Sequence, residues 1–277
     1  MSLLRVNNLS VKFGHDIKAL DDISFEIKKN EILGIVGESG SGKSTLARSI
    51  LKLQAASKGH IFWKNENINS FTKAQNKAYK KQIQMIFQDP LDALNPRMTV
   101  AQIISEPLLY LKPKLGKHKL SKQEITQLTQ KIMVSMGLSV EQLNRYPHEF
   151  SGGQCQRIGI ARAMIVEPEL LVCDEPVSAL DVSIQAQIIN LLKDLRTDHQ
   201  LSMMFISHDL SIVRHLCDRV LVLYKGKIAE MGETETIFQS PQSEYTQQLL
   251  ASIPLHDPSE ERQRVIAWGV SSSPQAR

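Results

Sequence analysis

Cysteine is scarce in this sequence, with three residues, Cys155, Cys173 and Cys217, in a chain of 277. Their number is odd and their spacing matches no metal-ligand pattern, which argues against a disulfide framework. We therefore expect a protein of a reducing cytoplasm.

Long apolar runs are also missing from the chain. No stretch approaches the roughly 20 consecutive apolar residues that cross a bilayer. The segment from Met1 to Asn8 lacks the charged-then-apolar pattern of a secretory signal. We therefore expect any membrane association to come through a partner.

A strong charge of one sign is absent too. The net charge is +4, and lysine and arginine are dispersed apart from a short cluster, Lys77–Lys81. We interpret this cluster as a solvated helix face, and contact with anionic lipid or nucleic acid is the alternative.

The apolar pattern changes near residue 30 and predicts an α/β fold. Residues 3 to 30 alternate apolar and polar positions, which is typical of antiparallel strands with one solvated face. Short continuous apolar runs follow, as expected of parallel strands buried on both faces. These runs are Ile32–Val36, Ile83–Phe87, Leu170–Cys173 and Met203–Ile206. A polar or glycine residue follows each run, and in open parallel sheets such strand ends meet at one ligand site.

A glycine-rich loop follows the first of these runs and predicts a phosphate site. The loop reads Gly37, Glu38, Ser39, Gly40, Ser41, Gly42, Lys43, Ser44, and a helical segment starts at Thr45. In this pattern the backbone N–H groups and the helix N-terminus bind phosphate oxygens. Lys43 would reach the β- and γ-phosphates, and Ser44 would ligate Mg²⁺. We therefore expect ATP and Mg²⁺ as ligands.

Polar residues after the other three runs are candidates for catalysis. Asp174 would hold Mg²⁺ and Glu175 would polarise the attacking water as general base; alternatively, the pair caps the next turn. His208 would contact the γ-phosphate or orient Glu175, although a lone histidine is more often structural. Gln88 would reach Mg²⁺ or water. Phe13 is a candidate for stacking on adenine, and a buried strand aromatic is the alternative.

A second glycine-containing motif predicts contact with a nucleotide held by another subunit. The tetrapeptide Ser151, Gly152, Gly153, Gln154 also satisfies a capping box and so could simply begin a helix. Each glycine costs on the order of 0.5–1 kcal/mol relative to alanine in a helix, so close approach of a phosphate explains them better. Because the chain's own loop already surrounds one side of a nucleotide, this motif would face the nucleotide of a second subunit.

The remaining segments complete the predicted organisation. Residues 88–165 are rich in helical pattern and prolines, which suggests an inserted helical subdomain. Apolar residues at helical spacing from Ile184 to Leu195 predict core packing. We expect an ATPase domain over residues 1–253 and a polar, loosely ordered tail over 254–277.

Together these motifs, with Ser178–Asp181, resemble the ordered motifs of an ABC-transporter ATPase, over about residues 3–253. This resemblance implies a P-loop ATPase with a mostly parallel core sheet, an antiparallel β subdomain and an inserted helical subdomain. It also implies that Asp181 belongs to the nucleotide site. The segments Phe87–Val100, Tyr146–Phe150 and Glu244–Leu250 resemble the second ATPase subunit of bacterial oligopeptide and dipeptide importers. Nickel and glutathione importers are close relatives.

The resemblance also implies partners and a location. We expect a homologous ATPase subunit in a heterodimer, two membrane-spanning permease subunits and an extracytoplasmic substrate-binding protein, with no nucleic acid. The chain would lie on the cytoplasmic face of the bacterial inner membrane, and the region after Gln88 would contact the permease. We expect the cysteine-rich extension seen in related subunits to be shortened or absent, because no cysteine follows Cys217. A non-transport ATPase of the same superfamily, or a P-loop kinase or switch, is the competing function.

Overall fold

The computed structural model describes residues 2–14, 17–111, 114–115 and 118–252. The predicted polar tail, 254–277, lies outside the described residues. No helix within the described ranges is long and apolar enough to cross a membrane.

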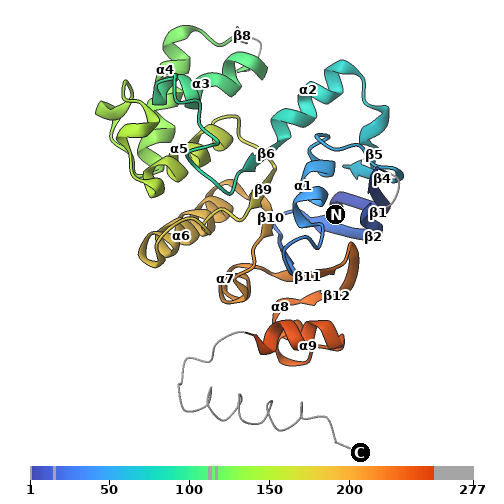
Figure 1. The fold of residues 1–277 in the computed structure, drawn as a ribbon. Helices are drawn as coiled ribbons and strands as arrows, with labels where there is room; N and C mark the ends of the chain where they lie inside the picture. Colours follow the sequence, from blue (N-terminus) through green and yellow to red (C-terminus); the bar gives the residue numbers. More distant parts are fainter. Residues whose placement is uncertain (1, 15–16, 112–113, 116–117, 253–277) are drawn as a thin grey trace, which may run out of the picture.

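An antiparallel sheet begins the fold, as the alternating pattern predicted. Strands β1 (Ser2–Phe13) and β2 (Ile17–Lys28) pair antiparallel, and β4 (Lys58–Trp63) and β5 (Glu66–Asn67) extend the sheet in the order β2-β1-β4-β5. Figure 1 shows this sheet on one side of the molecule, beside helices α1 (Lys43–Ile50) and α2 (Lys73–Gln82). The lysine cluster lies on α2, with Lys77 and Lys80 exposed and Tyr79 buried, which agrees with its interpretation as a solvated helix face.

The second sheet contains all of the predicted buried strands. Its order is β12-β11-β3-β10-β9-β6, and every neighbouring pair is parallel except β11 and β12. The predicted strands are β3 (Ile32–Val36), β6 (Ile83–Ile86), β9 (Leu170–Asp174) and β10 (Ser202–Ile206). The sequence analysis did not predict β11 (Arg219–Tyr224) or β12 (Lys227–Glu233).

Helices cover one face of this sheet and extend away from it. Between β6 and β9 lie α3 (Val100–Leu111), α4 (Lys122–Ser135) and α5 (Gly152–Met164), with single 3₁₀ turns at Val140–Gln142 and Pro147–Glu149 and a short hairpin, β7 (Lys114–Leu115) and β8 (His118–Lys119). The later helices are α6 (Val182–His199), α7 (Leu210–Leu216), α8 (Thr234–Gln239) and α9 (Glu244–Ala251). Pro107 lies inside α3 instead of ending it.

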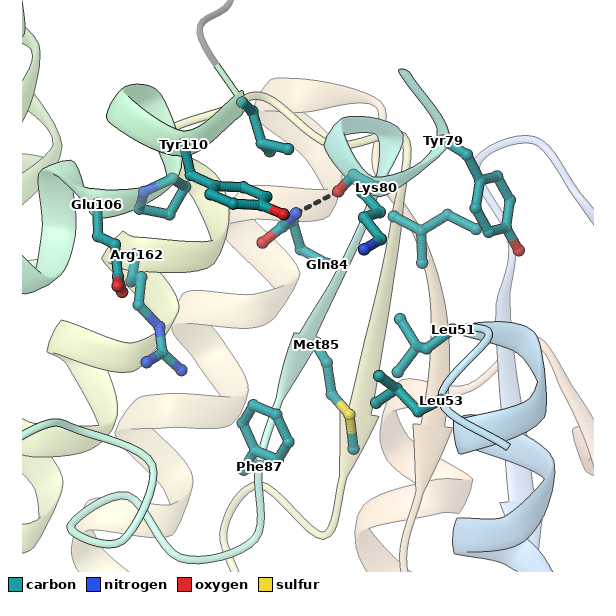
Figure 2. A pocket seen from close by; sticks show the side chains of 13 residues that line it. Leu51, Leu53, Tyr79, Lys80, Gln84, Met85, Phe87, Glu106, Tyr110 and Arg162 are labelled. Atoms are coloured by element: carbon teal, nitrogen blue, oxygen red, sulfur yellow. Dashed lines mark hydrogen bonds between the residues drawn. The ribbon is translucent and has the colours of Figure 1, made fainter. Parts of the chain in front are cut away.

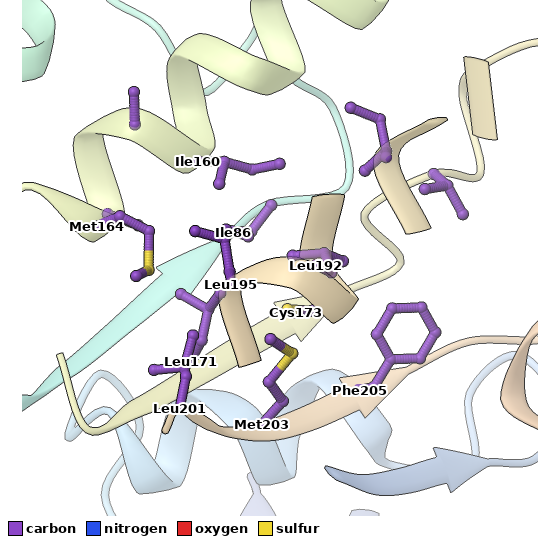
Figure 3. Packing of buried hydrophobic residues seen from close by; sticks show 14 of the residues in the cluster. Ile86, Ile160, Met164, Leu171, Cys173, Leu192, Leu195, Leu201, Met203 and Phe205 are labelled. Carbon is purple, nitrogen blue, oxygen red and sulfur yellow. The ribbon is translucent and has the colours of Figure 1, made fainter. Parts of the chain in front are cut away.

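The core explains why the parallel strands have no polar face. Successive residues of β9 point to opposite sides of the sheet, so Leu171 and Cys173 join one buried cluster while Leu170 and Val172 join the other. Figure 3 shows the first cluster, where the sheet packs against Leu192 of α6 and other helix residues. The predicted apolar stripe of α6 is therefore confirmed as core.

Candidate nucleotide site

The glycine-rich loop joins β3 to α1, and its three glycines adopt backbone conformations that other residues rarely adopt, with close packing at two of them. Gly37, Gly40 and Gly42 all have positive φ values of 146°, 79° and 110°. A Cβ atom on Gly37 would lie 2.1 Å from the carbonyl oxygen of Leu223, and one on Gly42 would lie 2.5 Å from that of Ala19. Only glycine fits this conformation, which leaves α1 to begin at Lys43 with its N-terminal amides free to bind an anion.

Lys43 is the buried cation of the loop. Its Nζ atom donates to the carbonyl oxygens of Gly37 at 2.7 Å and Glu38 at 2.9 Å. Burial lowers the pKa of Lys43, while the nearby carboxylates of Glu175 and Asp174 act in the opposite direction. The loop thus fixes the ammonium group at the base of the site.

Ser44 and Asp174 form a pair of hard oxygen ligands. The Ser44 hydroxyl donates to Asp174 Oδ1 across 3.3 Å, and Asp174 is only 8% exposed at the end of β9. Burial raises the pKa of Asp174, and the adjacent Glu175 carboxylate adds to the increase. Mg²⁺ commonly takes one or two protein oxygens and completes its shell with phosphate and water, so this pair fits the ion.

Side chains that follow β6 and β10 contact the same carboxylate oxygen of Glu175, which follows β9. Gln88, after β6, donates from Nε2 to Glu175 Oε2 at 3.2 Å. His208, after β10, lies with Nδ1 3.1 Å from the same oxygen. Glu175 itself has a left-handed φ of 48°, and its amide donates to the Ile206 carbonyl. This uncommon backbone conformation and the shared contacts hold the carboxylate at the carboxyl edge of the sheet, where the parallel strand ends were expected to converge.

A cavity of about 390 Å³ joins the loop to these strand ends. Of the candidate residues it is lined by Ser39, Gly40, Gly42, Lys43, Ser44, Thr45, Gln88, Glu175 and His208. Ala19 of β2 also lines the cavity. No sequence signal identifies this residue, because alanine carries no distinctive chemistry. Asp174 lies beneath, in contact with Ser44.

The tetrapeptide motif lies away from this cavity. None of Ser151 to Gln154, nor Asp181, lines it. Ser151 caps α5, where its hydroxyl accepts from the Gln154 amide at 3.3 Å while the Gln154 side chain accepts from the Ser151 amide at 3.0 Å. Asp181 caps α6. The capping box is therefore present, and contact of the motif with a partner's nucleotide stays a prediction.

Packing against α6 explains why one of the two glycines, Gly153, must be glycine. The sequence pattern did not reveal this reason. Gly153 is buried, and a Cβ atom there would lie 2.4 Å from Cγ2 of Ile184 in α6. Gly152 has more room, since its Cβ atom would meet Leu180 at 3.4 Å. At Gly153, packing against α6 therefore requires glycine whether or not a phosphate approaches it.

Phe13 lies at the end of β1, 43% exposed, and is not among the residues lining the cavity. The alternative of a buried strand aromatic is wrong. Stacking on adenine stays a prediction.

Comparison with known proteins agrees with the motifs and the fold. A family model described as "ABC transporter" matches residues 20–178. The chain belongs to the ABC transporter family. The oligopeptide transport ATP-binding protein OppF of Haemophilus influenzae is 49% identical over 95% of this chain and 82% of its own length. OppF of Bacillus subtilis is 50% identical over 90% of this chain and 80% of its own length.

Solved structures support the fold. The ATP-binding cassette MJ0796, in a dimeric post-hydrolysis state bound to ADP and Pi, has a TM-score of 0.73 and 27% identity, covering 83% of this chain and 98% of its own. The cbiO1 subunit of Clostridium perfringens has a TM-score of 0.77 and 26% identity, covering 95% of this chain and 98% of its own. The expected P-loop ATPase fold, with an antiparallel subdomain and a mostly parallel core sheet, is confirmed, and the cassette is an ATP-binding one.

Proposed function

We propose that this chain is the ATP-hydrolysing subunit of a bacterial importer that takes up oligopeptides or dipeptides. The observation that carries the proposal is the pairing of a complete phosphate-loop and carboxylate site with OppF relatives that are about half identical over most of the chain. The names of these relatives refer to oligopeptide transport, which favours peptide over the nickel and glutathione alternatives.

The residues at the cavity would have distinct roles in ATP hydrolysis. Lys43 would bind the β- and γ-phosphate oxygens, and Ser44 and Asp174 would hold Mg²⁺, which neutralises charge on the phosphates when bound. Glu175 would take a proton from the attacking water through a carboxylate oxygen. Gln88 and His208, both in contact with Glu175 Oε2, would orient that carboxylate.

A second ATPase subunit would complete the site. The tetrapeptide Ser151–Gln154 and Asp181 do not line the cavity of their own chain. All of these residues except the buried Gly153 are at least partly exposed, so this surface could face the nucleotide of a partner. The N-terminus of α5 carries partial positive charge toward that partner. The dimeric state of MJ0796 offers a precedent for two cassettes that pair, and we propose a heterodimer with a homologous subunit.

The permease would contact a groove between the core and the helices. The groove has a volume of about 440 Å³. Figure 2 shows the apolar side chains that line it, which include Tyr110 of α3, Met85 of β6, Phe87 just after β6 and Leu53 after α1. Tyr110 is 70% exposed and Leu53 is 67% exposed. Exposed apolar side chains gathered at a groove are typical of a protein contact.

The segment after Gln88 adjoins the same groove. Arg162 of α5 lines it and donates to the Ala93 carbonyl at 2.7 Å, which ties the segment to the helices. Arg97 is exposed, whereas Met98 packs against the core. Arg97 is therefore the more accessible of the two residues, because Met98 is partly buried. A permease seated here would couple Gln88 and Glu175 to the membrane. It would hold the chain at the cytoplasmic face of the inner membrane, with an extracytoplasmic binding protein supplying cargo.

Reconstitution of the assembled transporter tests the proposal. The chain, its partner ATPase and the permease are placed in vesicles with the binding protein, and labelled peptide uptake is measured with ATP on the cassette side. We expect peptide uptake to require ATP and to stop with Glu175→Gln. Uptake of nickel or glutathione in place of peptide, or co-purification with nucleic acid and no permease, would contradict it.

A further inference from the structure

The outer side of the phosphate loop is held by the last helix of the described chain. The backbone N–H of Glu38 donates to the hydroxyl oxygen of Tyr245 at 3.1 Å, although the two residues are 207 positions apart. Tyr245 lies in the first turn of α9. Burial raises the pKa of Tyr245, and the oxygen of its hydroxyl group accepts this hydrogen bond through a lone pair.

Tyr245 is itself fixed by its neighbours. Its ring stacks on Tyr224 at the end of β11, with 4.0 Å between ring centroids and 29° between planes. The start of α9 is anchored to β12, because the amides of Gln242 and Ser243 donate to the two carboxylate oxygens of Glu230 at 2.8 and 3.0 Å. The hydroxyl thus comes from a rigid element and not from a free side chain.

The β11–β12 hairpin supports the loop at two further points. The Gly226 amide donates to the Ser41 carbonyl at 3.0 Å. The Leu223 carbonyl lies so close to Gly37 that no Cβ atom fits between them. The β11–β12 hairpin and α9 therefore form one support beneath the loop.

The contact of Tyr245 reaches Lys43 through a single peptide group. The N–H of Glu38 and the C=O of Gly37 belong to the same peptide plane and point in opposite directions. Tyr245 accepts from the N–H, and Lys43 Nζ donates to the C=O at 2.7 Å. An acceptor on one side of a peptide fixes its plane and polarises the carbonyl on the other side. The orientation of Tyr245 is thereby passed to the ammonium group of Lys43.

We propose that Tyr245 is a positioning residue of the ATPase site, which orients the Gly37–Glu38 peptide and through it the Lys43 ammonium toward the nucleotide phosphates. This inference rests on the proposed role of Lys43. It gives α9 a part in nucleotide binding although no residue of α9 lines the cavity.

The test removes a single oxygen atom. Tyr245→Phe keeps the ring and its stacking but removes the acceptor for Glu38. Tyr224→Phe is the matched control, because it keeps the stacked ring and removes a hydroxyl that interacts with Lys225 instead. Affinity for a fluorescent ATP analogue with Mg²⁺ is measured on the full-length chain, with hydrolysis kinetics on the assembled transporter and Tm on both variants.

We expect Tyr245→Phe to weaken ATP binding by about 2- to 10-fold, the range of one hydrogen bond. KM should rise by a similar factor while kcat changes less, since phosphate binding is lost in ground and transition states alike. Hydrogen exchange of the loop amides should quicken, and Tm should stay close to that of the wild type. Tyr224→Phe should bind ATP as the wild type does.

Three results would overturn the inference: unchanged ATP affinity in Tyr245→Phe, an equal loss in Tyr224→Phe, or a fall in Tm with unchanged KM. Lys43→Ala separates this failure from failure of the site itself. If Lys43→Ala loses ATP and Tyr245→Phe does not, the nucleotide site stands and the role of Tyr245 falls.

Discussion

The two glycines at the start of α5 differ in the space around them, and alanine substitution should separate their roles. In Gly153→Ala the new Cβ atom would lie 2.4 Å from Ile184 Cγ2. Carbon atoms in contact normally lie about 3.5–4.0 Å apart, so α5 and α6 must move by roughly 1 Å. In Gly152→Ala the closest atom is at 3.4 Å, which is ordinary contact.

The difference between the variants isolates the clash. Both gain helix propensity, up to about 1 kcal/mol, because alanine replaces glycine in the same helical turn. Only Gly153→Ala meets overpacking, which typically costs about 1–3 kcal/mol. We expect Gly153→Ala to be less stable than Gly152→Ala by that amount, or by about 2–12 °C in Tm for a chain of this size.

Thermal unfolding of the two variants, followed by circular dichroism, measures this difference. Ile184→Ala removes the obstructing methyl group, so the double variant Gly153→Ala/Ile184→Ala should recover stability relative to the sum of the single changes, with a coupling of about 1 kcal/mol or more. Equal stability of Gly152→Ala and Gly153→Ala, or strict additivity in the cycle, would refute the packing argument.

The same comparison selects the better probe of the second-subunit contact. A charged residue at position 153 would disturb folding and phosphate contact together. Gly152→Asp introduces the charge with less steric conflict, so it should leave ATP binding to the chain's own loop intact and abolish hydrolysis in the assembled transporter. Loss of ATP affinity in the isolated variant would show that the motif acts within its own chain.

Further substitutions test the remaining parts of the site. Lys43→Ala should abolish most ATP binding, because it removes the buried cation of the loop; titration with a fluorescent ATP analogue measures this, and unchanged affinity would reject the loop as the site. Glu175→Gln should bind ATP but hydrolyse it about 10²–10⁴ times more slowly, since the amide keeps the shape and lacks the base; phosphate release in the assembled complex measures this, and wild-type turnover would remove Glu175 from catalysis. Arg97→Ala and Tyr110→Ala should weaken assembly with the permease without changing ATP binding, as measured by pull-down. Val134→Ala is the control at an exposed position outside the groove, and full assembly with normal uptake in the first two would show that the contact surface lies elsewhere.

The sequence by itself determined the local structure of the site. Short apolar runs predicted β3, β6, β9 and β10 because a strand buried on both faces cannot carry a polar side. The phosphate loop could be predicted because its glycines and Lys43 lie in one short segment with a characteristic backbone conformation. Strands β11 and β12 were not predicted, although β11 contains a similar apolar run, Val220–Leu223, because no candidate catalytic group follows that run.

The tertiary structure decided which groups touch. The sequence placed Gln88, Glu175 and His208 at strand ends, and only the order of β6, β9 and β10 in the sheet brings all three to one carboxylate oxygen. The clash that awaits any side chain at Gly153 depends on how α5 packs against α6. These facts involve distances between distant segments, which no local pattern records.

The contact between Tyr245 and the phosphate loop is the clearest case. The local sequence around Glu38 or Tyr245 does not indicate that the two residues are in contact. The hydrogen bond forms because the β11–β12 hairpin pairs beside β3 and places α9 next to the loop that follows β3. Local sequence specifies the conformation of each segment, because backbone preferences and burial act over a few residues. The packing of complete elements specifies which segments meet, and the fine positioning of the nucleotide site is determined there.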